Sequence, residues 1–240
     1  MTFSADTKVN EIALSNPQAR HILEDAGIDY CCGGGKSLGE ACLCANVPSD
    51  EILRQLRRNA EQVEPGEARW TSAPLDELTK HIRKRHHQYV RDAMPRLRAL
   101  LAKIREKHGS NHRELSEIEK LFADIAREML MHMQKEEQIL FPFIDSLECA
   151  ANGGKPLEVP FFQTVKNPIH SMMREHDSAG ELMQQIRSLS NGYKAPADAC
   201  TSYQAAYQGL DEFEKDLHLH VHLENNILFP RAVELEARAV

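Results

Sequence analysis

One pattern of eleven residues occurs twice in this chain and constrains its fold more than any other feature. Residues 132–142 read HMQKEEQILFP, and residues 220–230 read HVHLENNILFP. In each copy a histidine stands four residues before a glutamate, which places both side chains on one helix face, one turn apart. Apolar residues stand on the same face, seven and three residues before each histidine and seven residues after it. This is the spacing of a buried bundle seam, so the repeat predicts two His–Glu pairs inside a helix bundle.

Two more histidines continue the pattern. His87 and His176 are each followed by apolar residues at +3, +7 and +10. They lie 89 residues apart, close to the 88 residues that separate His132 from His220. We therefore interpret the chain as two helical hairpins related by a pseudo-twofold axis. The four helices are expected at about residues 74–107, 111–147, 168–189 and 197–236.

The predicted fold class is all-α: an antiparallel four-helix bundle with a small N-terminal helical domain. Leu, Ala, Glu, Arg, Lys and Gln dominate, and these residues favour helices. A chain of 240 residues with 42% hydrophobic residues can form one sizeable core and a smaller module. Pro65, Gly66 and Pro74 interrupt the helical pattern between the two. The predicted domains are residues 1–63 (helical, cysteine-containing), 64–73 (linker) and 74–240 (bundle).

Charge and cysteine content exclude several classes of protein. The net charge of −7 and the pI near 6.0 argue against a general nucleic-acid or anionic-membrane binder. We find no run of 18 apolar residues and no secretory signal at the N-terminus. Six cysteines, two of them adjacent, do not form the pattern of a disulfide framework. We expect a cytoplasmic monomer or homodimer with no nucleic-acid or membrane partner.

The polar residues on the buried seams predict a metal centre. Each would cost about 1 to 3 kcal/mol if buried without a partner. The alternative, a set of hydrogen-bonded core residues, needs basic partners for the two carboxylates, and the seams carry no matching set. A shared metal centre satisfies all six side chains. These are His87, His132, Glu136, His176, His220 and Glu224.

The chemistry of these side chains favours iron or manganese. Four imidazoles and two carboxylates without a thiolate suit those metals better than a structural zinc or a calcium site. Two carboxylates shared by two histidine pairs predict two ions bridged by Glu136 and Glu224. A solvent-derived oxo or hydroxo bridge would then leave one position open on each ion for a small molecule.

Several residues next to the ligand positions are candidates for supporting roles. Glu137, Glu175 and Asp177 flank ligand positions and are candidates to orient an imidazole. His170 is expected near the mouth of the site, with its role left open. The remaining histidines are expected at the surface or behind the ligands. These are His21, His81, His86, His108, His112, His218 and His222.

The helices with His-x-x-x-Glu pairs resemble the hemerythrin-like di-iron bundle. The whole chain is more similar to the repair-of-iron-centres family (YtfE/ScdA type), through DYCCGG at 29–34, REHDSAGE at 174–181 and both copies of the repeat. This resemblance implies two non-haem iron ions held by the six residues above. It also implies repair of iron–sulfur clusters damaged by nitrosative or oxidative stress, with the damaged proteins as iron acceptors.

The resemblance leaves the activity itself open. Iron delivery by reversible binding is the first interpretation, and a centre that captures or reduces nitric oxide is the alternative. A signalling module controlled by metal occupancy is a third possibility, and whether the chain is an enzyme stays undecided. Oxygen-carrying hemerythrins have a fifth histidine where this chain has Met172, and an aspartate where it has Glu224. These departures argue against a simple O2 carrier.

Cys31 and Cys32 are predicted to form a redox or iron/NO relay that docks near the metal centre. A disulfide between neighbouring residues is strained, and the glycines that follow are expected to leave the thiols accessible. If Ser37 begins a helix, its N-terminus would favour the thiolate. The alternatives are a buried cysteine pair and a four-thiolate site that includes Cys42 and Cys44. Gly35 and this Cys-x-Cys pair are not part of the family motif.

Overall fold

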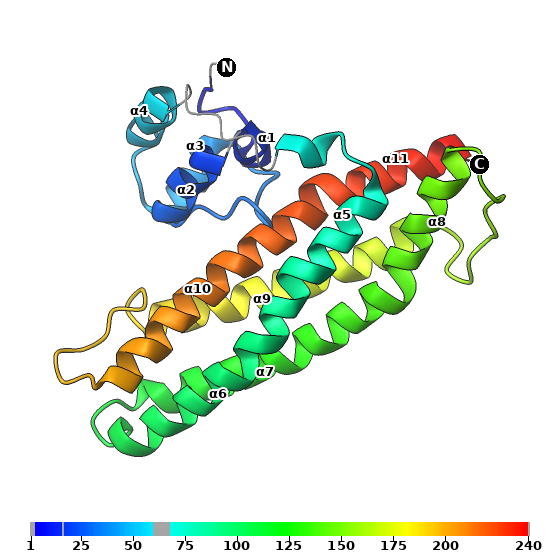
Figure 1. Cartoon of the computed structure of the whole chain (residues 1–240). Helices are drawn as coiled ribbons and strands as arrows, with labels where there is room; N and C mark the ends of the chain where they lie inside the picture. Colours follow the sequence, from blue (N-terminus) through cyan, green and yellow to red (C-terminus); the bar gives the residue numbers. More distant parts are fainter. Residues whose placement is uncertain (1–2, 16, 60–67, 240) are drawn as a thin grey trace.

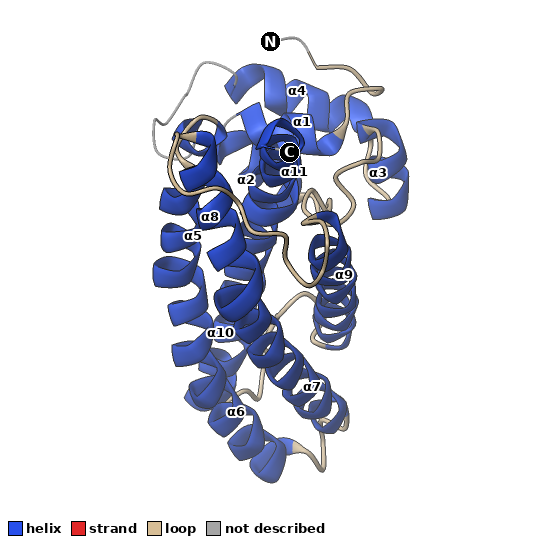
Figure 2. Ribbon diagram, turned by 90° about the vertical axis from the view of Figure 1, so that its right-hand side faces the viewer, coloured by secondary structure: helices blue, strands red, loops and turns tan. Residues whose placement is uncertain are grey.

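The structure is a computed structural model that describes residues 3–15, 17–59 and 68–239. Within these ranges the backbone forms helices and loops, one isolated bridge between Lys8 and Ser37, and no strand (Figure 2). The predicted all-α fold class is therefore confirmed.

In the described part of the chain, four long helical rods form an antiparallel bundle (Figure 1). The rod of α7 packs against those of α6 and α9, and α6 also packs against α10. Three rods each consist of two α-helices joined by a short π-helical segment. The first rod is α5 (Leu75–Ile82), η2 (Arg83–His87) and α6 (Gln88–His108), and the second is α7 (Glu114–Lys135), η3 (Glu136–Leu140) and α8 (Phe141–Ala151). The third is α9 (Lys166–Leu189), and the fourth is α10 (Thr201–Leu223), η4 (Glu224–Leu228) and α11 (Phe229–Ala239).

The π segments were not predicted, and they explain the end of the repeated motif. In both copies the phenylalanine N–H donates to the carbonyl five residues back, from Phe141 to Glu136 and from Phe229 to Glu224. A proline follows each phenylalanine, and in a regular helix its ring would collide with the carbonyl four residues back. The wider π turn places one more residue in the turn, which shifts the buried face of the helix that follows.

This shift overturns one expectation about the core. The regular spacing predicted a buried Ile139, but Ile139 is 37% exposed and Leu140 is buried in its place. The equivalent Ile227 is buried, as expected. The other predicted seam residues are buried as well. They are Val90, Met94, Leu97, Ile125, Met129, Ala179, Met183, Ile186, Phe213 and Leu217.

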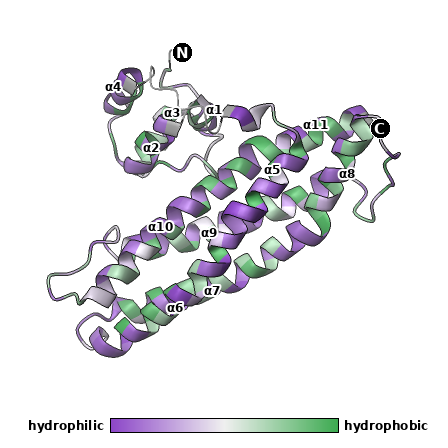
Figure 3. Cartoon of the chain, viewed as in Figure 1, coloured by the Kyte–Doolittle hydropathy of each residue, from purple (hydrophilic) through white to green (hydrophobic). Residues whose placement is uncertain are grey.

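Two apolar clusters form the core. Hydrophobic and hydrophilic stretches alternate along the rods (Figure 3). One cluster contains Val90, Met133 and Ala179, and the other contains Ile82, Leu140 and Met172. In the first three rods a site residue separates the two clusters. These residues are His87 in the first rod, Glu136 in the second and His176 in the third. The polar residues therefore form a layer with an apolar cluster on each side.

An N-terminal helical module lies beside α10 (Figure 1). Its helices are α1 (Val9–Ser15), α2 (Pro17–Asp25), α3 (Leu38–Ala45) and α4 (Ser49–Asn59). Ser37 is the N-cap of α3, which meets the condition stated for it above, and it forms a capping box with Glu40. The module is joined to the bundle by Asn226, whose side-chain amide donates to the Tyr30 carbonyl at 3.1 Å.

The segment between module and bundle is described only in part. Residues 60–67, which contain the end of the first predicted domain and the start of the predicted linker, lie outside the described residues. Ala68–Thr71 form a short 3-10 helix, η1, and Trp70 is buried in the same apolar cluster as Leu75. Arg231 donates to the carbonyls of Trp70 and Ala73, both at 2.7 Å. The domain boundaries stay a prediction, and the end of the predicted linker packs on the bundle.

Candidate metal centre

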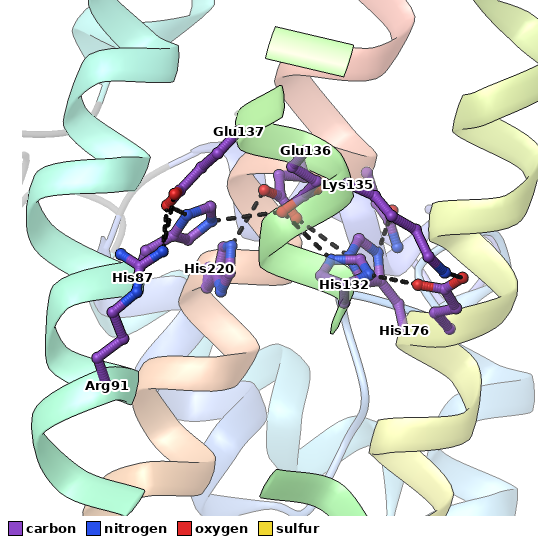
Figure 4. Close-up of polar contacts among 11 residues, drawn as sticks. His87, Arg91, His132, Lys135, Glu136, Glu137, His176 and His220 are labelled. Atoms are coloured by element: carbon purple, nitrogen blue, oxygen red, sulfur yellow. Dashed lines mark hydrogen bonds and ion pairs between the residues drawn. The ribbon is translucent and has the colours of Figure 1, made fainter. Parts of the chain in front are cut away.

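All six side chains predicted from the repeat come together in one layer of the bundle (Figure 4). Each is at most 1% exposed. The two glutamates are the first residues of the π segments η3 and η4, and His87 is the last residue of η2. His132, His176 and His220 lie on α7, α9 and α10. The amphipathic pattern of each rod therefore directs polar atoms to one interior region.

Within this layer the side chains form two groups that share both glutamates. His87 and His220 belong to one group and His132 and His176 to the other, and the potential ligand atoms of each group lie within 4.8 Å of one another. Glu136 Oε2 lies 3.3 Å from the Nε2 atoms of both His87 and His132. Glu224 lies 3.0 Å from His220 Nε2 through Oε1 and 3.1 Å from His176 Nε2 through Oε2. Each carboxylate thus lies between the two groups, as a bridging ligand would.

The atoms at the centre of the layer fit a bound cation. His87 Nε2, both Glu136 oxygens and Glu224 Oε2 are buried, and the contacts given above bring them near polar atoms without the geometry of a hydrogen bond to any described residue. Such groups are rare in folded proteins unless water or an ion satisfies them. His132 Nε2 and His176 Nε2 face each other at 3.0 Å. Two nitrogens that bind one ion at about 2.1 Å, at right angles, are about 3 Å apart.

Groups behind the ring nitrogens orient three of the histidines. Glu137 accepts a hydrogen bond from His87 Nδ1 at 2.6 Å, and Glu175 accepts one from His132 Nδ1 at 3.0 Å. Asn225 Oδ1 accepts from His176 Nδ1 at 2.9 Å. Hydrogen bonds of this kind keep the Nε2 lone pair directed at the ion. The contacts expected of Glu137 and Glu175 are present, whereas Asp177 is exposed.

A cation pairs with each of the two outer carboxylates. Arg91 lies 2.7 Å from Glu137, and Lys135 lies 2.5 Å from Glu175. Burial would raise the pKa of Glu137, but Arg91 and His87 outweigh it, so the pKa is lowered. The hydrogen bond from His132, with a smaller contribution from Lys135, lowers the pKa of Glu175 to about 2. Both carboxylates are therefore anionic at neutral pH and strengthen the basicity of the imidazoles that they contact.

The fourth histidine differs from the others. His220 Nδ1 is buried and has no hydrogen-bond partner within the described ranges. The ring of His86 stacks on it with centroids 5.5 Å apart, and His86 Nδ1 lies 3.2 Å from Asp216. His86 occupies the position in its rod that Glu175 occupies in α9, one residue before the site histidine. The pseudo-twofold is thus broken, with a carboxylate behind one ligand and an imidazole ring behind its counterpart.

Sequence reasoning missed Asn225, although the repeat contained a signal for it. Asn225 follows Glu224 as Glu137 follows Glu136. Each of these two residues contacts the histidine of a different rod, which explains why the position after the glutamate is polar in both copies. Asp216 had no comparable signal, because its contact with His86 depends on the packing of α10 against the first rod.

The phenylalanines of the repeat also contact the site. Phe141 stacks on His87 with ring centroids 5.7 Å apart, and Phe229 stacks on His176 with centroids 6.0 Å apart. Both phenylalanines belong to the same apolar cluster. The phenylalanine of each copy therefore packs against one imidazole of the site. The proline that follows it comes directly after the π turn.

Two of the histidines expected at the surface or behind the ligands are buried. His86 is completely buried and lies behind His220, and His222 is 1% exposed. The ring of Tyr30 packs edge-on against His222 at 5.4 Å, and Asn226 contacts His222 Nδ1 at 2.9 Å. His222 does not lie at the surface, the first of the two positions expected for it, because the N-terminal module covers that face of α10. His170 is exposed, and its predicted position at the mouth stays untested.

Charge in the metal-free site is balanced between carboxylates and imidazoles. Burial opposes protonation of His132, but the Glu136 carboxylate and its neighbours outweigh it and raise the pKa of His132 to about 10. Glu224 raises the pKa of His220 in the same way against the effect of burial. The pKa values of Glu136 and Glu224 are lowered by these cations although burial acts to raise them. Protons therefore occupy positions that a metal cation would take.

The cysteine pair lies beside the site, in a loop organised by Asp29. The Asp29 carboxylate accepts hydrogen bonds from the backbone N–H groups of Cys31, Cys32 and Gly33, at 2.8 to 2.9 Å. Asn225, which orients His176, also donates to the Cys31 carbonyl at 3.3 Å. One asparagine side chain thus connects the cysteine loop to a site histidine.

Cys31 departs from what the sequence led us to expect of these thiols. Cys31 is only 6% exposed, so the glycines do not leave it accessible. Its hydrogen bond with Cys32, burial and the Asp29 charge raise the pKa of Cys31 well above its usual range, which disfavours the predicted thiolate. Cys32 is partly exposed, and the role of the pair as a relay stays a prediction.

None of the helices in the described ranges combines the length and the apolar character needed to cross a membrane.

Known proteins are similar to this chain over nearly its whole length, not only at the site. Residues 79–232 match the family described as "Hemerythrin HHE cation binding domain", and residues 5–60 match "Domain of Unknown function (DUF542)". The chain is 37% identical over 228 residues to "Iron-sulfur cluster repair protein YtfE" of Escherichia coli O81 (strain ED1a), which covers 95% of this chain and 97% of the relative. The protein of that name from Escherichia fergusonii gives the same identity and coverage.

The match of residues 79–232 to a cation-binding domain agrees with a metal-binding layer inside a helix bundle. The chain therefore belongs to the family of the YtfE iron–sulfur cluster repair proteins, with a hemerythrin-type cation-binding domain over most of its length.

Proposed function

We propose that this protein holds two iron ions and delivers iron to iron–sulfur clusters damaged by nitrosative or oxidative stress. The single observation that supports this most is the pair of ligand groups that share Glu136 and Glu224. His87 and His220 would bind one ion, His132 and His176 the other, and the two glutamates would bridge them. Imidazole and carboxylate donors without thiolate suit iron. Bound iron would supply a redox-active centre, and the same ions are the cargo in delivery.

The residues around the ligands support reversible binding. Outer carboxylates at Glu137 and Glu175 remain 25% and 31% exposed, although the histidines that they contact are buried. Each therefore connects a ligand to solvent, where it can attract an incoming cation or accept a departing one. In the structure, Arg91 and Lys135 hold these carboxylates in place through hydrogen bonds. The apolar clusters on both sides limit the access of bulk water to the layer.

Iron transfer to an acceptor tests the proposal. The protein is loaded with Fe²⁺ under anaerobic conditions, freed of unbound metal and mixed with an acceptor whose iron–sulfur cluster lacks iron. We expect about two irons per chain and recovery of the cluster absorbance. Glu136→Ala should lose iron and fail to restore the acceptor. Glu212→Ala, at an exposed position on α10, is the matched control and should behave like the parent protein.

The outcomes separate delivery from the nitric oxide alternative. Equal recovery with Glu136→Ala or with metal-free protein would contradict delivery from this site. Tight NO binding at the iron without transfer would instead indicate capture, and release of nitrous oxide would indicate NO reduction.

A further inference from the structure

We infer that Asp29, Cys31 and Cys32 form a second cation site, suited to a thiophilic divalent metal ion, at the edge of the bundle beside His176. The ligand atoms of these three residues lie within 4.8 Å of one another. The two sulfur atoms are 3.9 Å apart, and Cys31 Sγ lies 3.1 Å from Asp29 Oδ1. The site mixes two soft sulfur ligands with one hard oxygen ligand, in contrast to the imidazole and carboxylate layer.

The separation of the sulfurs fits joint binding of one ion. Two thiolates at about 2.3 Å from a tetrahedral ion are about 3.8 Å apart. In the structure the Cys31 thiol lies between two acceptors, the Asp29 oxygen and the Cys32 sulfur. A proton thus occupies a position that a bound cation would take, and binding would release both thiol protons to solvent. The ion would also neutralise the negative charge that two thiolates and a carboxylate concentrate in this loop.

The loop is organised before any ion binds. Three backbone N–H groups bind the Asp29 carboxylate, and Gly34 approaches its neighbours closely. A Cβ at Gly34 would lie 2.6 Å from the Tyr30 carbonyl oxygen, so a side chain there would displace the loop. Cys42 and Cys44 are not members of this ligand group, which replaces the four-thiolate alternative with a site of two sulfurs and one oxygen.

The position of the loop indicates what the site is for. The Asn225 amide bridges the Cys31 carbonyl and His176 Nδ1, at 3.3 Å and 2.9 Å. Cys32 Sγ lies 3.9 Å from the place where a Cβ on Gly180 would stand, and Gly180 lies one turn after His176 on α9. The cysteine site therefore lies behind the His176 ring, on its Nδ1 side, next to the group that contains His132 and His176. It can receive an ion from that group by ligand exchange, without a change in oxidation state.

This role rests on the proposed function for the origin of the ion, but the site itself can be tested alone. Cobalt(II) is added anaerobically to the metal-free full chain in the presence of a phosphine reductant. We expect a thiolate-to-cobalt charge-transfer band in the near ultraviolet that saturates with added cobalt. Cys31→Ser and Cys32→Ser should each remove the band at the cobalt concentration that saturates it in the parent protein, a concentration at which the buried layer is also occupied. Cys44→Ser, at an exposed cysteine of the same module, is the control and should retain it.

A variant of the buried layer keeps the two proposals distinguishable. The layer contains no sulfur, so Glu136→Ala should lose iron and retain the thiolate band. A wild-type protein without the band would overturn the second site and leave the proposed function intact. Loss of the band in Cys44→Ser but not in Cys32→Ser would also overturn it. Circular dichroism of each variant establishes that the module is folded, and a band that persists in folded Cys31→Ser and Cys32→Ser equally contradicts the inference.

Discussion

At the scale of single residues, the site is defined by what stands behind each histidine. Three imidazoles donate to a side-chain oxygen, and the fourth stacks on another imidazole. The two ions would therefore have unequal surroundings, although their direct ligands are the same in kind. One has Glu137 behind His87, and the other has Glu175 and Asn225 behind its two histidines.

Removing the charge of one outer carboxylate should affect one ion more than the other. Glu137→Gln keeps an acceptor for His87 Nδ1 but loses the charge that strengthens this ligand and leaves Arg91 unpaired. We expect iron affinity to fall by about tenfold or more at one of the two positions. Chelator competition followed by iron quantitation measures the loss. Glu117→Gln, on the exposed face of α7, should change nothing, and two equally weakened positions would contradict the unequal surroundings.

His86 is expected to stabilise the fold more than it binds metal. It is fully buried, stacks on His220 and contacts Asp216, yet it belongs to neither ligand group. His86→Ala leaves a cavity and removes one of the two partners of the Asp216 carboxylate, which keeps its ion pair with Arg85, so the free energy of unfolding should fall by about 2 to 4 kcal/mol. Iron stoichiometry should persist at low temperature. Denaturant titration beside the exposed-site control His170→Ala measures the difference, and a stable variant without iron would show that His86 is a ligand.

At the scale of elements, the π segments set the phase of the helices that follow them. In the second rod, η3 turns the buried face from the predicted Ile139 to Leu140, and this brings Phe141 against His87. If the same residues formed a regular α-helix, α8 would be rotated about the helix axis by about 100°, because one residue fewer would fit in the turn.

Deletion of Gln138 therefore tests the π segment. The shortened helix would become regular and keep Phe141 and Ile144 in phase with Glu136, but the Pro142 ring would then meet the carbonyl four residues back. We expect a loss of thermal stability, because a bend at this proline would disturb the packing of α8 on the bundle. Gln138→Ala keeps the length of the rod and should behave like the parent, because Gln138 is exposed. An undisturbed deletion variant would show that the extra residue is dispensable.

The two neighbouring glycines of the cysteine loop offer a matched pair. A Cβ at Gly34 would meet the Tyr30 carbonyl oxygen at 2.6 Å and Asn10 Cβ at 2.9 Å, whereas a Cβ at Gly35 meets nothing within 4 Å. Gly34→Ala should destabilise the module by about 1 to 3 kcal/mol, and Gly35→Ala should change stability by less than about 0.5 kcal/mol. Hydrogen exchange of the N-terminal helices reports both effects. Equal protection in the two variants would contradict the close packing at Gly34.

At the scale of the whole molecule, protons and metal compete for one buried layer. The raised pKa of His132, about 10, means that this imidazole is protonated at pH 7 and must lose its proton when metal binds. Metal affinity should therefore rise with pH, by about tenfold per unit for each proton displaced, until the pH approaches 10. Cobalt(II) titrations at several pH values from 6.5 to about 9 measure this dependence, and an affinity independent of pH would contradict the raised pKa.

Stability of the metal-free protein should depend on pH with the opposite sign. A histidine whose pKa is higher in the folded state stabilises the fold fully below its unfolded pKa of about 6.5. This contribution is lost as the pH rises toward the folded value of about 10. Iron loading should remove most of this dependence, because the metal replaces the proton.

The sequence alone determined the helical class and the six residues of the layer. The 3.6-residue period places His132 and Glu136 on the apolar face of a helix wherever that helix packs, so local spacing was sufficient. The start of α3 at Ser37 could be considered from the sequence as well, because an N-cap is a local interaction. Glu137 and Asn225, the polar residues after the two glutamates, belong to the same repeat. The repeat alone did not show which histidine each of them contacts.

Only the tertiary structure decided how these residues pair. His87 is grouped with His220 and His132 with His176 because the first rod packs on the fourth and the second on the third. The π turns, the burial of His222 and the position of the cysteine loop beside His176 likewise depend on contacts between segments far apart in the chain. A helical period states which face of an element is buried, whereas the identity of the neighbour on that face is set by the packing of the whole molecule.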